Sequence, residues 1–183
     1  MNKRLQKLMV GLFSLSLLTG CGKQEVTYAK FKEDVASAPE KTYKTAKVTG
    51  KVVTKTSDSD KETVNFNFDF TFAVNADKWL STGENEGEDT ERELEVLGHI
   101  NVNLKTDLDS YYNSASFKYY VGNGFEIKGT QEVTVLGVSV KTEIDVKYDK
   151  YLHLASYKSE YTVKNAEGQN VTTTKTFKVS YKA

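Results

Sequence analysis

The sequence contains few of the residues that build covalent or metal-linked scaffolds. Its 183 residues include one cysteine and one proline. A single cysteine excludes an internal disulfide bond and any zinc site made of several cysteines. A single proline excludes a proline-rich linker. The formal net charge is zero, so the chain lacks the positive excess that is typical of nucleic-acid-binding proteins.

Apolar residues are also fewer than usual, at 38% of the chain. Globular proteins average about 45–50%. Aromatic residues make up 11%, and they compensate because each buries a large area. The length predicts one domain, which is large enough to bury a stable core without disulfide bonds or bound metal ions.

The only marked apolar run near the N-terminus spans residues 8–18 and is too short to cross a membrane. As a helix it would extend about 16 Å, whereas the hydrocarbon core is about 30 Å thick. Lys3, Arg4 and Lys7 precede it. A basic start followed by a short apolar run is typical of a secretory signal, so we predict a removed leader over residues 1–20.

Leu18, Thr19, Gly20 and Cys21 follow in the order of the lipobox of bacterial lipoproteins, which they resemble. The resemblance implies cleavage between Gly20 and Cys21 and a diacylglyceryl group on the Cys21 thiol. Two acyl chains hold a protein firmly at a bilayer. The alternative is a buried free cysteine behind an ordinary signal peptide.

The lipoprotein reading predicts a protein anchored at the extracytoplasmic face of a bacterial cell membrane. In a Gram-negative host the outer membrane is an alternative location. An aspartate after the cysteine would indicate retention in the inner membrane, but Gly22 occupies that position. Loss of the leader leaves 22 basic and 25 acidic residues, a net charge of −3. Anionic lipid repels an acidic body, so we expect the lipid and not electrostatics to anchor the chain.

After a tether over residues 21–24, the pattern of residues 25–38 predicts an amphipathic helix. Thr27 is the expected N-cap, and Pro39 ends the helix because it lacks an amide donor. The apolar residues recur at helical spacing: Tyr28, Phe31, Val35 and Ala38.

From Tyr43 onward the apolar residues recur at every second position, as in half-buried strands. The clearest strand is Val64–Val74, in which phenylalanine and valine alternate with mostly polar residues. Short turns between the strands favour antiparallel pairing. We therefore expect a mainly β domain over residues 25–183, in which about eight or nine strands form a meander that curves into a half-barrel or barrel.

Residues 84–95 are strongly acidic, and an apolar alternation follows them. We interpret the acidic run as a loop and the next residues as a strand. Thr90 and Glu93 could instead form the capping box of a short helix. The preferred reading puts His99, like His153, inside a strand. The residues expected on one face of the strand are Leu94, Val96, Ile100, Val102 and Leu104.

Catalytic signals are weak throughout the chain. No G-x-S-x-G motif occurs, and Gly137-Val-Ser139 lacks the second glycine. The acidic run could bind Ca²⁺, but it lacks the D-x-[DN]-x-[DN]-G spacing, so we expect a solvated loop. We predict no enzyme activity, no metal and no cofactor.

The aromatic inner faces of the expected sheet offer a candidate lining for a hydrophobic ligand. The same side chains could instead interdigitate and fill the interior, and the sequence leaves both readings open. The candidate residues are Phe66, Phe68, Phe70, Phe72, Phe117, Phe125, Ile144 and Phe177.

The succession of lipobox, tether, amphipathic helix and long meander is similar to the lipoprotein carriers of the LolA/LolB and LppX/LprG type. That resemblance implies a half-barrel with helices over its mouth that binds acyl chains. It favours a non-enzymatic lipoprotein that carries a hydrophobic or lipid ligand.

The alternative function is a cell-surface interaction or adhesion module that meets a surface protein or glycan through an exposed face rich in Tyr, Thr and Lys. Tyrosine gives a large contact area at low entropic cost. The tyrosines expected to take part are Tyr111, Tyr112, Tyr119, Tyr120, Tyr151, Tyr157 and Tyr161.

Overall fold

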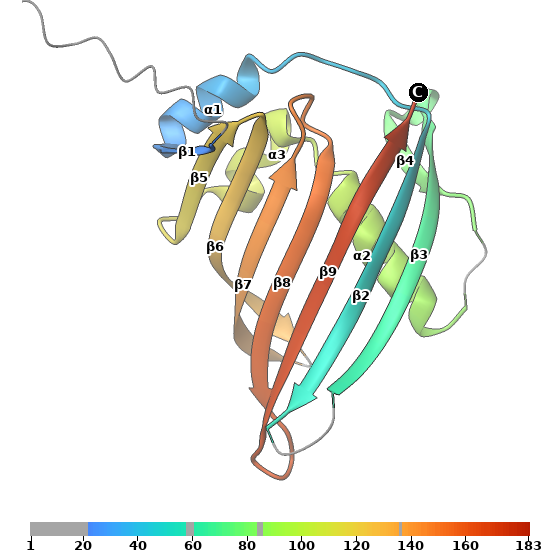
Figure 1. Cartoon of the computed structure of the whole chain (residues 1–183), viewed down its shortest axis with the longest axis vertical. Helices are drawn as coiled ribbons and strands as arrows, with labels where there is room; N and C mark the ends of the chain where they lie inside the picture. The colour runs from blue at the N-terminus through green and yellow to red at the C-terminus, as the bar shows by residue number, and fades with distance from the viewer. Residues whose placement is uncertain (1–21, 58–60, 84–85, 136) are drawn as a thin grey trace, which may run out of the picture.

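The computed structural model describes residues 22–57, 61–83, 86–135 and 137–183. In this part of the chain one antiparallel sheet of nine strands carries three α-helices on its concave side, and a short 3₁₀ helix connects β3 to β4 (Figure 1). The strands are β1 (Gln24–Val26), β2 (Thr45–Thr56), β3 (Lys61–Ala73), β4 (Lys78–Ser81), β5 (Phe117–Gly122), β6 (Gly124–Val135), β7 (Val138–Tyr148), β8 (Leu154–Lys164) and β9 (Asn170–Lys182). The helices are α1 (Tyr28–Ala36), η1 (Val74–Ala76), α2 (Glu88–Ile100) and α3 (Leu104–Tyr112).

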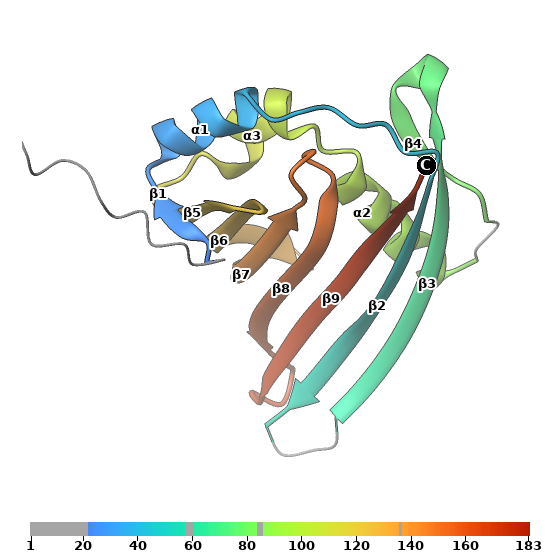
Figure 2. The same ribbon diagram turned by 45° about the horizontal axis from the view of Figure 1, so that its top comes forward.

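The spatial order of the strands is β1-β5-β6-β7-β8-β9-β2-β3-β4. Hairpins join β5 through β9, and the first long strand, β2, pairs with the last, β9. The antiparallel meander is thus confirmed, but the sheet is open, with β1 and β4 at its edges. A closed barrel is therefore wrong. Figure 2 shows the curvature that the open sheet retains.

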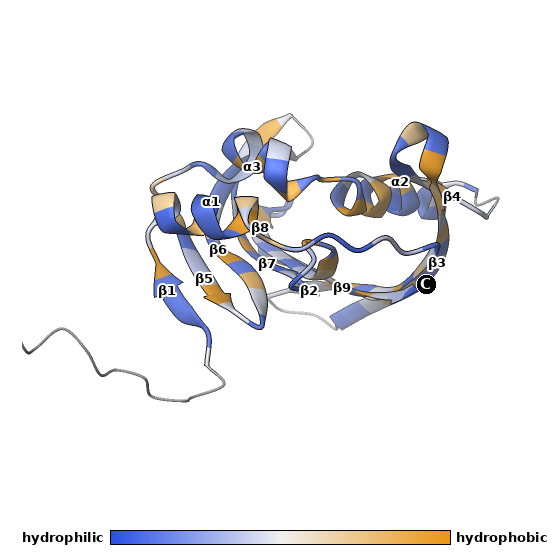
Figure 3. Ribbon diagram, turned by 90° about the horizontal axis from the view of Figure 1, so that it is seen from above, coloured by the Kyte–Doolittle hydropathy of each residue, from blue (hydrophilic) through white to orange (hydrophobic). Residues whose placement is uncertain are grey.

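The two faces of the sheet differ in chemistry as the alternation predicts. Val48 of β2 lies opposite Phe68 of β3 and Val179 of β9, all on the concave face. Their sequence neighbours Lys47 and Thr49 are exposed on the convex face. Figure 3 shows, from above, that the helices lie on one side of the sheet. The core lies between the helices and the concave face.

Helix α1 begins three residues later than predicted, because residues 24–26 pair with β5 as strand β1. Thr27 caps the helix, as expected, by accepting a hydrogen bond from the Lys30 amide at 3.3 Å. Phe31 and Val35 are the buried side chains of the helix. They fix α1 over the β5–β6 corner of the sheet.

The predicted strand over residues 94–104 is wrong, as is the count of a single helix. Helices α2 and α3 occupy this region, joined by residues 101–103. Several apolar residues of this segment lie two positions apart, as in a strand, but the buried side chains recur at four-residue spacing, as on a helix. They are Val96, Ile100, Leu104, Leu108 and Tyr112. Asn103 caps α3 by accepting a hydrogen bond from the Lys105 amide at 3.0 Å.

Among the described residues, no helix has the length and apolar character that crossing a bilayer requires.

Candidate functional site

The predicted aromatic lining lies in the packed core of the concave face. Phe66 stacks on Phe68 with ring centroids 5.3 Å apart, and Phe177 stacks on Tyr157 at 5.2 Å. Seven of the eight residues are buried, and Phe72 is half-buried against Trp79. Their contact with a ligand stays a prediction. None of the eight residues lines the cavity between α2 and the sheet.

That cavity has a volume of about 460 Å³ and lies between α2 and the concave surface of strands β6 to β9 and β2. Its volume falls within the range of about 300–1,000 Å³ that is usual for small-molecule sites. Its wall mixes apolar and polar groups. Helix α2 contributes Arg92, Glu95 and His99, and the sheet contributes among others Val52, Val133, Thr142, Tyr157, Ser159 and Lys175.

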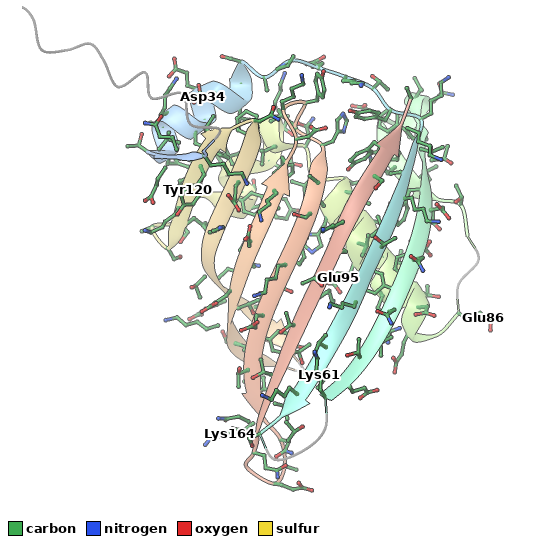
Figure 4. All side chains as sticks on the ribbon, in the orientation of Figure 1. Asp34, Lys61, Glu86, Glu95, Tyr120 and Lys164 are labelled. Atoms are coloured by element: carbon green, nitrogen blue, oxygen red, sulfur yellow. The ribbon has the colours of Figure 1, made fainter. Side chains whose placement is uncertain are left out.

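An ion pair spans the cavity from helix to sheet. The Lys175 ammonium on β9 donates a short hydrogen bond to the Glu95 carboxylate on α2. Figure 4 shows Glu95 on the helix behind the sheet. His99 Nε2 lies 4.0 Å from Glu95, and its ring packs on Tyr157 with centroids 4.1 Å apart. The ion pair therefore ties the helix to the sheet at the rim of the cavity, where Glu95 remains partly exposed to solvent.

Burial controls the protonation of the two ring systems. It lowers the pKa of His99 below its usual value, despite the opposing pull of Glu95. The imidazole is then neutral at pH 7 and leaves Lys175 as the cation beside Glu95. Burial likewise raises the pKa of Tyr157 to about 12, so that its phenol stays protonated and can donate a hydrogen bond.

Thr142 on β7 carries a buried hydroxyl group that is unpaired within the described part of the chain. Its side chain lines the cavity and the residue is only 4% exposed, yet its hydroxyl oxygen has no hydrogen-bond partner among the described residues. A buried polar atom left unpaired costs about 1–3 kcal/mol. A ligand with a polar group beside Thr142 would recover that energy.

One feature of the sequence indicates this site: a lysine occupies an inward position of a predicted strand. On β9 the concave positions are apolar at Phe177 and Val179, but Lys175 interrupts them. A lysine at an inward position of a strand is rarely buried without a partner. Its partner, Glu95, lies on α2. The predicted strand over residues 94–104 gave no reason to place Glu95 opposite Lys175.

The two histidines lie elsewhere than predicted. His99 is on α2, and His153 precedes β8 in a turn, where its Nε2 lies 2.6 Å from the Lys41 carbonyl oxygen. Within the described ranges no cluster of His, Cys, Asp or Glu could hold a metal ion. Most of the acidic run belongs to α2, and Arg92 pairs with Glu88 and Asp89 there.

The seven tyrosines of the adhesion hypothesis do not share one exposed surface. Tyr112, Tyr119 and Tyr157 are buried in the core. Tyr119 donates a hydrogen bond to the Tyr112 carbonyl oxygen at 2.5 Å. Tyr111 is the member with a largely exposed side chain, on α3.

A second charged cluster lies on the convex face, where Glu126 of β6 is buried among lysines. Its carboxylate meets the ammonium groups of Lys23, Lys128 and Lys147 at 2.8, 3.1 and 3.3 Å. Burial alone would raise the pKa of Glu126, but the bonds from Lys23 and Lys128 outweigh it and lower the pKa to about 2. This pairing stabilises the fold above the usual carboxyl pKa, and its contribution is lost as the pH falls towards 2.

Gly20 and Cys21, the predicted cleavage and lipidation residues, lie outside the described residues. Lys23 and strand β1 lead directly from them into the sheet.

No described protein family matches the chain, and no curated protein matches its sequence. A LolA superfamily protein from Nitrosomonas europaea is a distant structural match. The two sequences are 10% identical, the alignment covers 85% of this chain and 92% of that chain, and the TM-score is 0.23.

Proposed function

We propose that this protein is a non-enzymatic, extracytoplasmic lipoprotein that binds a small amphiphile in the concave cavity. The observation that carries the proposal is the unpaired hydroxyl of Thr142 in a wall that also holds Lys175. If water alone filled the cavity, the apolar part of its wall would stay in contact with water, which is unfavourable. A ligand with an apolar body and a polar head satisfies both parts of the wall.

The charges favour an anionic head. Lys175 holds Glu95 in the unliganded protein, and a ligand carboxylate would share or replace this partner. Thr142 and Tyr157 supply hydroxyl donors at the same wall. The apolar portion would pack on Val52 and Val133. A fatty acid is the simplest compound with this distribution of groups.

The Thr142→Val substitution tests this binding mode. It removes the hydroxyl at nearly constant volume, so the unliganded protein should be as stable as the wild type or slightly more stable. We expect the Kd for a fluorescent fatty acid, cis-parinaric acid, to rise about tenfold, since a hydrogen bond to a charged group contributes at least about 1.5 kcal/mol. Fluorescence titration measures this.

The matched control is Thr176→Val, which changes the same atoms on the convex face of β9 and should leave the Kd unchanged. Two results would contradict the proposal. One is a wild-type protein that does not bind the probe, and the other is equal affinity in the wild type and the Thr142→Val variant.

The anchor has its own test, which rests on the Leu18–Cys21 segment. Cells that express the full chain and grow with an alkyne analogue of palmitate should label the wild type and Gly22→Ala but not Cys21→Ser. Mass spectrometry of the mature protein should find Cys21 as the first residue, with a diacylglyceryl group. An unlabelled wild type, or a free thiol at Cys21, would show that the anchor is absent.

A further inference from the structure

Lysines gather on the convex face of the three adjacent strands β8, β9 and β2. Each of them is exposed, and each alternates with a residue that points into the core or cavity. Glu160 is the single acidic residue at the convex positions of these three strands. We call this surface the lysine face: Lys47, Lys51, Lys55, Lys158, Lys164, Lys178 and Lys182.

The opposite side of the molecule carries the opposite charge. Residues 86–109, which include α2 and most of α3, contain eight acidic residues and two basic ones. The net charge of −3 expected for the mature chain therefore conceals a strong separation between the two sides. Salt screens the interaction between charges that are more than about 10 Å apart. A charged partner therefore responds to the face of the protein that it contacts and not to the net charge.

The centre of the lysine face contains a hollow lined by hydrogen-bond donors, which can bind a group that accepts hydrogen bonds. A shallow hollow of about 440 Å³ has Lys51, Lys158 and Lys178 at its wall, together with hydroxyl groups such as that of Thr49. Asp145 also lines the hollow, and the ammonium groups of Lys128 and Lys147 neutralise its carboxylate. In the described part of the chain, Lys51 and Lys178 take part in no ion pair. Ammonium and hydroxyl donors on one surface fit the oxygens of phosphate diesters.

Lys23, which immediately precedes strand β1, contacts the convex face of the sheet. The side chain of Lys23, two residues after Cys21, reaches Glu126 on the convex face. Strand β1 lies five strand positions from β9, which corresponds to about 24 Å at the usual strand spacing. A lipid on Cys21 would be attached two residues before a side chain that contacts the convex face.

We propose that the lysine face docks on the anionic phospholipid headgroups of the membrane that holds the anchor. The proposal rests on the anchoring part of the proposed function. It corrects the expectation that the acidic mature chain is repelled as a whole, because the acidic helices point away from the bilayer. The concave cavity then opens away from the membrane, so its ligand arrives from the aqueous side.

The test uses the acylated chain bound to vesicles. The native cysteine is blocked by lipid, so a cysteine introduced by Thr49→Cys on the lysine face or by Gly98→Cys on α2 carries a fluorophore at one site. Both residues are exposed. A quencher attached to lipid headgroups reports contact, in vesicles of phosphatidylcholine alone or mixed with phosphatidylglycerol.

We expect strong quenching at position 49 only with phosphatidylglycerol, reversal in high salt, and no such change at position 98. Replacing three lysines of the face, Lys51, Lys158 and Lys178, by glutamine should lower the docking equilibrium constant by about 100-fold. The control triple replaces Lys41, Lys78 and Lys150, which lie off the lysine face, and should retain docking despite the same loss of charge.

Three results would overturn the docking. The first is equal quenching at position 49 in both vesicle types. The second is an equal docking equilibrium constant for the two triple variants. The third is protection of position 49 by soluble polyglycerol phosphate but not by anionic vesicles. The last result would assign the face to a free polymer. Failure of the anchor itself is distinguishable, because the chain would then not bind phosphatidylcholine vesicles at all.

Discussion

The Phe31→Ala substitution should lower the free energy of unfolding by about 4 kcal/mol. Phe31 is fully buried and is one of two buried side chains that hold α1 on the sheet. Its ring lies 5.1 Å from that of Tyr119 and meets Phe125 edge-on at 5.7 Å. Its removal leaves a cavity that the rigid strands below cannot fill, so both burial and packing are lost. Urea denaturation in detergent solution measures the change.

The control for Phe31 is Tyr111→Ala on α3, where the removed side chain is 58% exposed. This change should cost less than about 0.5 kcal/mol. Hydrogen exchange should also accelerate in α1 of the Phe31→Ala protein and not in α2, which packs elsewhere. A loss below about 1 kcal/mol would mean that α1 contributes little to the fold.

The Gly129→Ala substitution should cost about 3 kcal/mol, although it adds one methyl group. Gly129 on β6 lies opposite Phe117 of β5. An added Cβ would lie 2.2 Å from the Ser116 carbonyl oxygen and 2.9 Å from the Phe117 Cα. Both are backbone atoms, so the clash is relieved only when β5 moves as a whole. That movement would disturb the contact of β5 with α1.

The same substitution at Gly98 should have the opposite sign. Gly98 lies inside α2, and beyond its chain neighbours and the backbone of its own helix no described atom lies within 4 Å of its added Cβ. Alanine favours a helix interior over glycine by about 0.5–1 kcal/mol. Urea midpoints of the two variants should therefore move in opposite directions. A fall in the midpoint at Gly98, or no fall at Gly129, would contradict this account of the two glycines.

The charge separation between the two sides depends on which residues of each strand point outward. In the sequence, Lys47 and Lys178 are 131 positions apart and belong to no common motif. Pairing of β2 with β9 brings Lys178 opposite Thr49, two residues from Lys47. Composition alone therefore gave an acidic mature body, whereas the sheet divides it into one basic and one acidic side.

The sequence by itself determined the long strands β2, β3 and β5 to β9, because a period of two is a local property. The run from Val64 to Phe72 has one apolar face in any register that folds, and the hairpin turns favour antiparallel pairing. The predicted strand extended one residue too far, because Val74 lies in η1 and is exposed. The capping of α1 by Thr27 was equally local. These features need only neighbours along the chain, and the structure confirms them.

The tertiary structure alone decided the path of residues 84–112 and therefore the cavity. An alternating and a helical pattern overlap at Val96, Ile100 and Leu104, so the local sequence supports both. Burial of the Val96 and Ile100 side chains against the core selects the helix. Only then do Glu95 and Lys175, 80 positions apart, meet across the concave face. Strand pairing between distant segments likewise left the sheet open, since no local pattern specifies whether its edges meet.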